Sequence, residues 1–369
     1  MNQKNKRLLE IDFLRGVAIL LVLFRHQDLT KYTTNMGWIG VDLFFVLSGF
    51  LVSGLLFKEY KKFGKIDAVR FLIRRGFKIY PVYYLTYGLY LILIIKNNKL
   101  DIEKLFYDLT FLQNYFNEWG YAYGASWSLA IEEHFYFGLT FIIWLGLKVK
   151  IINFQDNVRK NKFLLAIILL IIISIILKFH SNYFNSENNV LNFTMTHLRI
   201  DSLLVGVLIA YFYHFKFNLI KQFTTKYKYL LLLFFVITLT WTPFIEPISS
   251  SFVKTFGFIM LYLSFGSLLL IFLFTNNMES YINKYLPNPL NKIIYNIGYC
   301  SYSIYIIHML INSVIYSLFV NLNIIDYKAL HFITSLLLSI IAGMLLTFKV
   351  ENYFLTLRDK IYPSKAKFI

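Results

Sequence analysis

The sequence is poor in charged residues and almost without cysteine. Only 15% of its 369 residues are charged, whereas 57% are hydrophobic, which exceeds the roughly 45–50% of an ordinary soluble domain. This composition excludes a water-soluble domain and indicates a membrane protein. The single cysteine, Cys300, lies within an apolar stretch, so the sequence also excludes a disulfide framework and a thiolate metal site, and we expect no metal.

Long apolar blocks are the main feature that is present. A bilayer core about 30 Å thick requires around 20 residues of helix, and we count ten such blocks. They lie at about 11–28, 38–57, 78–96, 127–147, 162–179, 193–214, 228–244, 255–275, 293–320 and 329–349. The expected fold is all-α, a polytopic membrane protein of about ten transmembrane helices. We expect residues 1–369 to form one integral-membrane domain with no appended soluble domain.

The placement of the positive charge predicts the orientation of these helices. The net charge of +17 would suggest a nucleic-acid partner in a soluble protein, but here most of the 37 lysines and arginines fall in alternate connections. These are the N-terminal tail, the loops after the second, fourth, sixth and eighth helices, and the C-terminal tail. The positive-inside rule then places both termini in the cytoplasm of a multi-pass protein of the inner (plasma) membrane. We expect membrane lipid and no nucleic acid as a partner.

Ionisable residues lie inside the first predicted helix, in the segment "RGVAILLVLFRH". Arg15 and His26 are eleven positions apart, which on a helix is about three turns and a rise of roughly 16 Å. They therefore share one face, with Arg15 towards the cytoplasm and His26 towards the far side. Such groups normally face a bundle interior or an aqueous cavity. The alternative is that both side chains extend to the nearest headgroups.

Three further ionisable residues are expected at the same outer depth as His26. Asp42, Glu132 and Arg199 each come within the first two turns of helices that run from outside to inside. Their convergence from separate helices favours a site. The simpler interpretations are that the carboxylates complement helix dipoles, and that Arg199 pairs with Asp201 or with a neighbouring helix.

The densest cationic feature is the segment "VRFLIRRGFKIYPVYY". Arg70, Arg74 and Lys78 recur every four residues and form one ridge on a helix, with Arg75 beside it. Pro81 is expected to interrupt or kink the helix that follows. One interpretation of the ridge is that its cations set the orientation of the helix in the membrane and attract anionic lipid. The alternative is that they form a phosphate-binding patch.

These residues suit transfer of a group to a hydroxyl. A neutral histidine such as His26 can take a proton from a hydroxyl near neutral pH. Glu132 would orient the imidazole, as in a catalytic triad, and Arg199 would stabilise a developing oxyanion or bind an anionic acceptor. We find no serine or cysteine in a nucleophile elbow, so direct attack by the acceptor hydroxyl is simpler than a covalent acyl-enzyme.

An ordered set of motifs runs from the first predicted helix to the ninth: "RGVAILLVLFRH", "GWIGVDLFFVLSGFLVSG", "RRGFKIYP", "SWSLAIEEHFYF", "RIDSLLVG" and "YSIYIIH". In this order and spacing the chain resembles the acyltransferase-3 family of membrane acyltransferases, which O-acylate cell-surface and secreted glycans. The family's arginine–histidine pair falls on Arg15 and His26, and its Ser-Leu-x-x-Glu element falls on Ser128, Leu129 and Glu132. Its basic element falls on Arg74, Arg75 and Lys78, and its later arginine falls on Arg199. Lys78 departs from the family pattern, which commonly has arginine there, and lysine lacks the bidentate fork for phosphate.

The resemblance implies an O-acetyltransferase that takes acetyl from cytoplasmic acetyl-CoA. The acceptor would be a hydroxyl of a glycan or lipid-linked glycan, such as lipopolysaccharide, peptidoglycan or exopolysaccharide. The catalytic residues are expected to be His26, Glu132, Arg15 and Arg199, and the acyl-CoA-binding residues Arg70, Arg74, Arg75 and Lys78. Acceptor binding is assigned to Asp42, Trp127, Ser128, Tyr136 and His308, although for His308 a packing role is the simpler interpretation.

Two other classes of function remain open from the residues alone. A secondary transporter or flippase of a glycan or lipid-linked precursor would also place charges within spans. A non-catalytic partner of a polysaccharide export complex would use the cationic ridge only to bind lipid.

Overall fold

Long helices make up most of the described chain. The computed structural model describes residues 9–27, 29–187, 189–324 and 326–363, and no strand occurs among them. A helix lies at each of the ten predicted blocks: α1 (Leu9–His26), α3 (Ile39–Phe63), α4 (Ala68–Lys96), α7 (Trp127–Lys148), α8 (Lys162–Phe184), α10 (Thr196–Phe215), α11 (Phe217–Leu239), α12 (Phe258–Phe274), α15 (Ser301–Asn321) and α16 (Lys328–Leu346).

Shorter helices lie in the connections and near the chain's end. They are α2 (Lys31–Gly37), α5 (Ile102–Leu109), α6 (Gln113–Phe116), η1 (Val158–Lys160), α9 (Leu191–Thr194), η2 (Val253–Gly257), α13 (Met278–Tyr285), α14 (Asn288–Tyr299), η3 (Thr347–Glu351) and α17 (Asn352–Ile361). Of these, η2 and η3 are π-helical turns, which are rare and occur often at functional sites.

Seven segments of the described chain are long and apolar enough to cross a membrane, and they contain α3, α4, α8, α10, α12, α15 and α16. The other three predicted spans lie on α1, α7 and α11. Charged residues such as Arg15 and Glu132 lower the apolar character of α1 and α7, and α11 is kinked at Tyr227. The all-helical membrane fold is therefore confirmed, whereas the crossing of ten helices stays a prediction.

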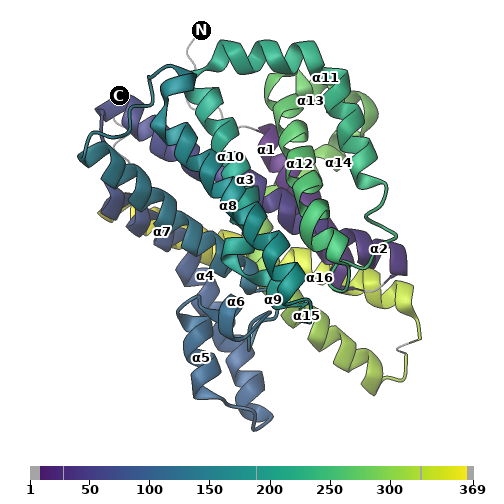
Figure 1. Ribbon diagram of the computed structural model, residues 1–369. Helices are drawn as coiled ribbons and strands as arrows, with labels where there is room; N and C mark the ends of the chain where they lie inside the picture. Colours follow the sequence, from purple (N-terminus) through teal and green to yellow (C-terminus); the bar gives the residue numbers. More distant parts are fainter. Residues whose placement is uncertain (1–8, 28, 188, 325, 364–369) are drawn as a thin grey trace.

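Helices α1, α3 and α10 form the centre of the bundle (Figure 1), and α3 packs along α10 at close range. A Cβ atom at Gly49 would lie 2.0 Å from the carbonyl oxygen of Leu203, and one at Gly206 would lie 2.2 Å from that of Val46. Only glycine fits at this backbone contact, because any larger side chain would separate the helices. Both glycines lie within the motifs "GWIGVDLFFVLSGFLVSG" and "RIDSLLVG".

The cationic segment and the proline after it belong to a single helix. The predicted ridge is helical, since Arg70 and Lys78 both lie on α4. The expected interruption at Pro81 was wrong, because α4 continues through it to Lys96. Proline removes one backbone donor, and packing of α4 against α7, α15 and α17 supports the helix around that gap.

The connection between α4 and α7 is organised around one buried carboxylate. Asp108 on α5 accepts hydrogen bonds from the backbone N–H groups of Tyr121 and Ala122 and from the side chains of Asn117 and Tyr87. These hydrogen bonds hold the aromatic- and glycine-rich segment that leads into Trp127, the first residue of α7. The segment is thereby fixed over one end of the bundle.

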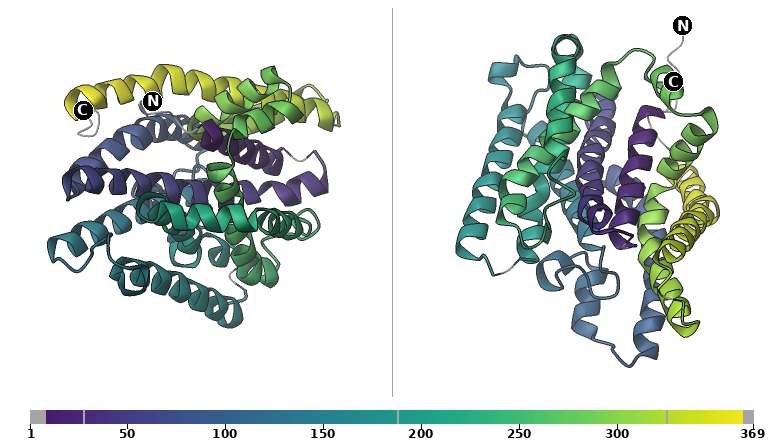
Figure 2. Two further views of the ribbon diagram at one scale, coloured as in Figure 1. Left: turned by 90° about the horizontal axis from the view of Figure 1, so that it is seen from above. Right: turned by 90° about the vertical axis from the view of Figure 1, so that its right-hand side faces the viewer.

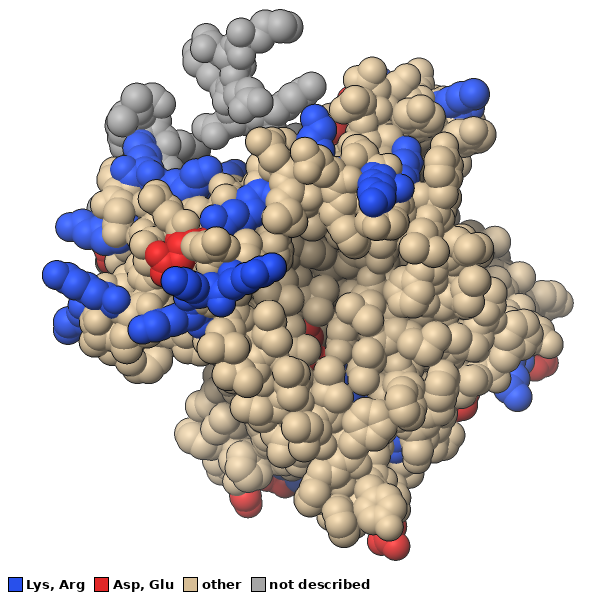
Figure 3. Space-filling view, turned by 45° about the horizontal axis from the view of Figure 1, so that its top comes forward, with Lys and Arg blue, Asp and Glu red and all other residues tan. Residues whose placement is uncertain are grey.

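The start of α1 and the end of α17, where the described chain begins and ends, lie towards the same end of the molecule, and α5 projects from the opposite end (Figures 1 and 2). On the face towards the two chain ends, Lys and Arg side chains gather around a hollow (Figure 3). The side of the membrane that this face meets stays a prediction.

Candidate active site

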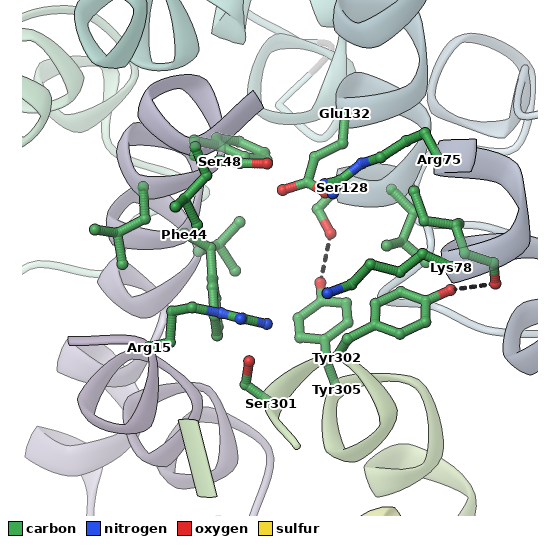
Figure 4. A pocket seen from close by; sticks show the side chains of 16 residues that line it. Arg15, Phe44, Ser48, Arg75, Lys78, Ser128, Glu132, Ser301, Tyr302 and Tyr305 are labelled. Carbon is green, nitrogen blue, oxygen red and sulfur yellow. Dashed lines mark hydrogen bonds between the residues drawn. The ribbon is translucent and has the colours of Figure 1, made fainter. Parts of the chain in front are cut away.

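A pocket between α1, α3, α4, α7 and α15 brings together several of the predicted site residues (Figure 4). We call it the cationic pocket, after Arg15, Arg75 and Lys78 in its wall. Arg15 and Lys78 extend towards each other from opposite walls. Its remaining lining residues are Val41, Phe44, Phe45, Leu47, Ser48, Leu51, Ile79, Ser128, Leu129, Glu132, Ser301, Tyr302 and Tyr305.

Arg75 and Glu132 meet in this pocket through a tyrosine. Arg75 Nη2 donates to the hydroxyl oxygen of Tyr136 at 2.7 Å, and the Tyr136 hydroxyl donates to Glu132 Oε2 at 2.6 Å. The guanidinium carbon of Arg75 also lies 4.4 Å from the centre of the Tyr136 ring, and Ser48 Oγ is 2.7 Å from the same hydroxyl. Tyr136 thus links the arginine to the carboxylate, and its role in acceptor binding stays a prediction.

Lys78 has a partner that the sequence reasoning missed. Its Nζ lies 3.8 Å from Glu351 Oε1, and Ser303 Oγ donates to Glu351 Oε2 at 3.1 Å. Glu351 is only 4% exposed and ends the π-helical turn η3. It falls two residues beyond the last predicted span, but its charge beside an apolar helix is the same signal that identified Arg15 and Glu132.

The cationic ridge divides between two environments. Arg75 and Lys78 line the pocket. Arg70 donates to the carbonyl oxygen of Pro363, and Arg74 donates to that of Tyr362 and pairs with Asp359 at 2.9 Å. The same helix thus supplies two cations to the pocket and two to the chain segment at the end of α17.

A second pocket lies further along α1, and we call it the histidine pocket. His26 and Arg199 line it together with a concentration of aromatic side chains. The remaining lining residues are Val22, Arg25, Thr34, Trp38, Val41, Trp119, Gly124, Ala125, Trp127, Phe193, Ile248, Tyr305 and Met309. The empty space in the two pockets, open solvent included, is about 760 and 1150 Å³.

His26 lies beside a second histidine. The ring centres of His26 and His308 are 5.1 Å apart, and Asn312 Nδ2 donates to the carbonyl oxygen of His26 at 2.8 Å. His308 Nδ1 is 2.6 Å from the carbonyl oxygen of Tyr305. Since a carbonyl only accepts, Nδ1 carries the proton and Nε2 a lone pair. This Nε2 is buried without a hydrogen-bond partner among the described residues.

Arg199 is held by a buried ion pair with Asp42. Arg199 Nη2 lies 2.7 Å from Asp42 Oδ1, and both side chains are 1% exposed. The guanidinium carbon is 3.4 Å from the centre of the Phe258 ring and 5.2 Å from that of Phe193. Asp201, the partner considered from the sequence, pairs with Lys178 at 2.5 Å instead. The Nε and Nη1 atoms of Arg199 have no hydrogen-bond partner within the described chain.

A loop between α11 and η2 reaches the histidine pocket through Arg25. Arg25 Nη2 lies 3.7 Å from Glu246 Oε1, and Glu246 Oε2 accepts from both the backbone N–H and the hydroxyl of Ser249. Partial burial alone would raise the pKa of Glu246, but the hydrogen bonds from Ser249 and the charge of Arg25 lower it below its ordinary value. The carboxylate is therefore ionised at neutral pH.

The expected partnership of Glu132 with His26 is not what the structure shows. Glu132 lines the cationic pocket and accepts from Tyr136, whereas His26 lines the histidine pocket beside His308. The expected convergence of Arg199 with His26 does occur in one pocket. Glu132 lies one turn further along α7 than Ser128, where the Tyr136 hydroxyl connects it to Arg75 of α4.

Two residues line both pockets, Val41 of α3 and Tyr305 of α15. The Tyr305 hydroxyl is 2.6 Å from Ser128 Oγ and donates to the carbonyl oxygen of Ala125 at 2.9 Å. Ser128 belongs to the cationic pocket and Ala125 to the histidine pocket. The pockets therefore adjoin, with Val41 and Tyr305 between them.

The sequence model of a family described as "Acyltransferase domain" matches residues 8–349. The chain belongs to this acyltransferase-3 family. The matched residues include every helix that lines the two pockets. No solved structure matches the chain.

The chain is also similar to curated proteins of Staphylococcus aureus. A protein of strain COL named "Putative O-acetyltransferase SACOL0978" is 28% identical over 333 residues, which cover 84% of this chain and 52% of the relative. The O-acetyltransferase OatA of strain NCTC 8325 / PS 47 is 31% identical over 216 residues, covering 54% of this chain and 34% of the relative. The chain thus spans about half the length of the first of these relatives.

Proposed function

We propose that this acyltransferase is a membrane O-acetyltransferase, which moves an acetyl group from acetyl-CoA in the cationic pocket to a hydroxyl in the histidine pocket. The observation that carries the proposal is the meeting of the two pockets at Val41 and Tyr305. One pocket offers cations for a phosphate-rich donor, and the other offers a histidine for an acceptor hydroxyl. The names of the similar O-acetyltransferases support this choice of reaction.

The donor would be held by Arg15, Arg75 and Lys78. Guanidinium groups bind phosphate bidentately, and lysine adds a point charge. Arg15 and His26 lie on one helix, eleven residues and therefore about 16 Å apart. The flexible pantetheine arm of the donor would span this distance and bring the thioester towards His26.

The transfer step needs a base, and His26 would supply it. The imidazole removes the proton from the acceptor hydroxyl as its oxygen attacks the thioester carbonyl. The new C–O bond forms, the C–S bond breaks, and the departing thiolate takes up a proton to leave as free CoA. Arg199, whose Nε and Nη1 have no partner within the described chain, would stabilise the developing negative charge or bind an anionic acceptor.

The acceptor would be a glycan or lipid-linked glycan of the cell envelope. Trp38, Trp119 and Trp127 line the histidine pocket, and aromatic rings with a polar edge suit stacking against sugar rings. The cation-rich end of the molecule (Figure 3) would face the cytoplasm, where acetyl-CoA is made, in the plasma membrane. The histidine pocket would then open towards the outer side.

The test is the release of free CoA thiol from acetyl-CoA by the full chain in lipid nanodiscs, with a mixture of surface glycans as acceptor. We expect release by the wild type, and a loss of about 10²–10⁴-fold in His26→Ala. The matched control is His180→Ala, an exposed histidine of α8 outside both pockets, which should keep the wild-type rate.

Two outcomes would contradict the proposal. Near-normal release by folded His26→Ala would remove His26 as the base. Absence of thiol release by a wild-type protein that transports the glycan and leaves acetyl-CoA intact would favour a transporter or flippase instead.

A further inference from the structure

The wall between the two pockets is formed by Val41 and Tyr305, and several contacts hold the Tyr305 side chain in place. Tyr305 is 7% exposed, and its hydroxyl is fixed by Ser128 and Ala125, which both belong to α7 or the turn that starts it. The ring is packed edge-on against Phe44, with 6.3 Å between ring centres, and lies 5.6 Å from the His308 ring. Rotating this ring away would break both hydrogen bonds.

The backbone of Tyr305 is fixed as well as its side chain. Its carbonyl oxygen accepts hydrogen bonds from His308 Nδ1 and from the hydroxyl of Tyr123. The other residue that lines both pockets, Val41, precedes Asp42 on α3, and the carboxylate of Asp42 is bound to Arg199. Val41 is β-branched and therefore has little rotamer freedom on a helix. Both sides of the wall are held by contacts that extend into the bundle.

The surfaces next to this wall are small or apolar on both sides. Phe44 and Leu129 flank it in the cationic pocket, and Val22, Ala125 and Met309 flank it in the histidine pocket. Such surfaces suit the hydrocarbon end of an acyl group and disfavour the charged parts of CoA. A donor held by Arg75 and Lys78 would therefore enter the passage with its acyl group first, and its charged parts would stay in the cationic pocket.

We propose that Val41 and Tyr305 form a fixed constriction that sets the length of acyl group the enzyme accepts. This inference rests on the proposed function, because it assigns the two residues to the path between donor and acceptor. A rigid apolar constriction discriminates one methylene by about 10–200-fold. The Tyr305 ring limits the acyl group by its volume, and its hydroxyl serves to hold the ring in place.

The experiment measures CoA thiol release from acetyl-, propionyl- and butyryl-CoA by the full chain in nanodiscs with the glycan mixture. The quantity compared is the ratio of the butyryl to the acetyl rate in each variant, so a general loss of activity cancels. We expect Val41→Ala to raise this ratio at least about 10-fold and Val41→Ile to lower it. Tyr305→Ala should raise it further, whereas Tyr305→Phe, which keeps the volume of the ring but loses the two hydrogen bonds that fix it, should raise it less than Tyr305→Ala does.

Val236→Ala is the matched control for Val41→Ala. Val236 is 52% exposed on α11 and lines neither pocket, so its ratio should equal that of the wild type. If Tyr305→Ala fails to fold, the two opposite changes at Val41 still test the constriction.

The outcomes separate this inference from the proposed function. Release of thiol with the same ratio in Val41→Ala, Val41→Ile and wild type overturns the constriction and leaves the acetyltransferase intact. A ratio that rises in Tyr305→Phe as much as in Tyr305→Ala assigns the effect to the hydroxyl and also overturns it. No thiol release from any acyl-CoA by the wild type overturns the proposed function and this inference with it.

Discussion

The imidazole of His26 lies 5.1 Å, centre to centre, from that of His308, and the two residues come from α1 and α15. The hydrogen bond of His308 Nδ1 to the Tyr305 carbonyl leaves Nε2 as a buried acceptor without a partner among the described residues. A proton-accepting nitrogen therefore stands next to the proposed base, in the position where Glu132 was expected. It would assist His26 by taking up or sharing the proton removed from the acceptor.

The first prediction concerns this second histidine. His308→Asn keeps an N–H donor near the position of Nδ1 and removes the Nε2 acceptor. We expect kcat to fall, by less than the 10²–10⁴-fold typical of losing a general base, with KM for acetyl-CoA unchanged. Steady-state kinetics and the pH profile of kcat measure this, and a wild-type kcat and profile in folded His308→Asn would assign the ring to packing alone.

The second prediction separates the structural and functional roles of Arg199. Arg199→Met leaves Asp42 buried without its partner, which should cost about 3–5 kcal/mol of unfolding free energy. The double variant Asp42→Leu/Arg199→Met removes both charges and should recover most of that stability. Reversible unfolding in mixed detergent micelles measures these differences.

Transfer activity should behave differently from stability in the same variants. Arg199 lines the histidine pocket, so the double variant should stay deficient in acetyl transfer although it is stable. Recovery of both stability and activity would show that Arg199 serves only the ion pair.

The third prediction follows from the divided cationic ridge. Arg75→Gln and Lys78→Gln should each raise the KM for acetyl-CoA by roughly 10–100-fold, the loss expected for a hydrogen bond to a charged group. Arg70→Gln serves as the matched control, because Arg70 binds the chain segment after α17 rather than the pocket. It should leave KM near wild type and increase protease cleavage near Pro363. Equal KM effects in all three variants would contradict the division.

The fourth prediction concerns the ion pair between Arg25 and Glu246, which connects the loop between α11 and η2 to α1. The pKa of Glu246 is lowered in the folded protein from an ordinary value of 4.5, so ionised Glu246 stabilises the fold above that value. This contribution is lost as the pH falls through the lowered pKa. The hydrogen-exchange protection factors of residues 246–249, which are corrected for the intrinsic pH dependence of exchange, should therefore fall in acid. Glu246→Gln should show low protection factors at every pH, and protection factors that do not change with pH in the wild type would contradict the role of the Arg25–Glu246 pair.

The sequence alone was enough to predict where the long helices lie and which ionisable residues they carry. Apolar block length located every long helix, because a bilayer-spanning segment must satisfy its own backbone hydrogen bonds. Helical periodicity also placed Arg15 and His26 on one helix and identified the α4 ridge. Glu351 was missed because it follows the last apolar block, within a π-helical turn that no sequence pattern marked.

Only the tertiary structure decided which charges meet. Depth along each helix predicted a common level for Asp42, Glu132, Arg199 and His26, but depth does not specify how neighbouring helices are rotated or which pairs touch. Packing of α3 on α10 joins Asp42 to Arg199, and packing of α4 on α7 joins Glu132 to Arg75 through Tyr136. The wall of Val41 and Tyr305 likewise exists only once α3 and α15 are packed together. A sequence specifies what each helix carries, whereas contacts between helices depend on rotation and register, which the shapes of all the packed side chains determine together.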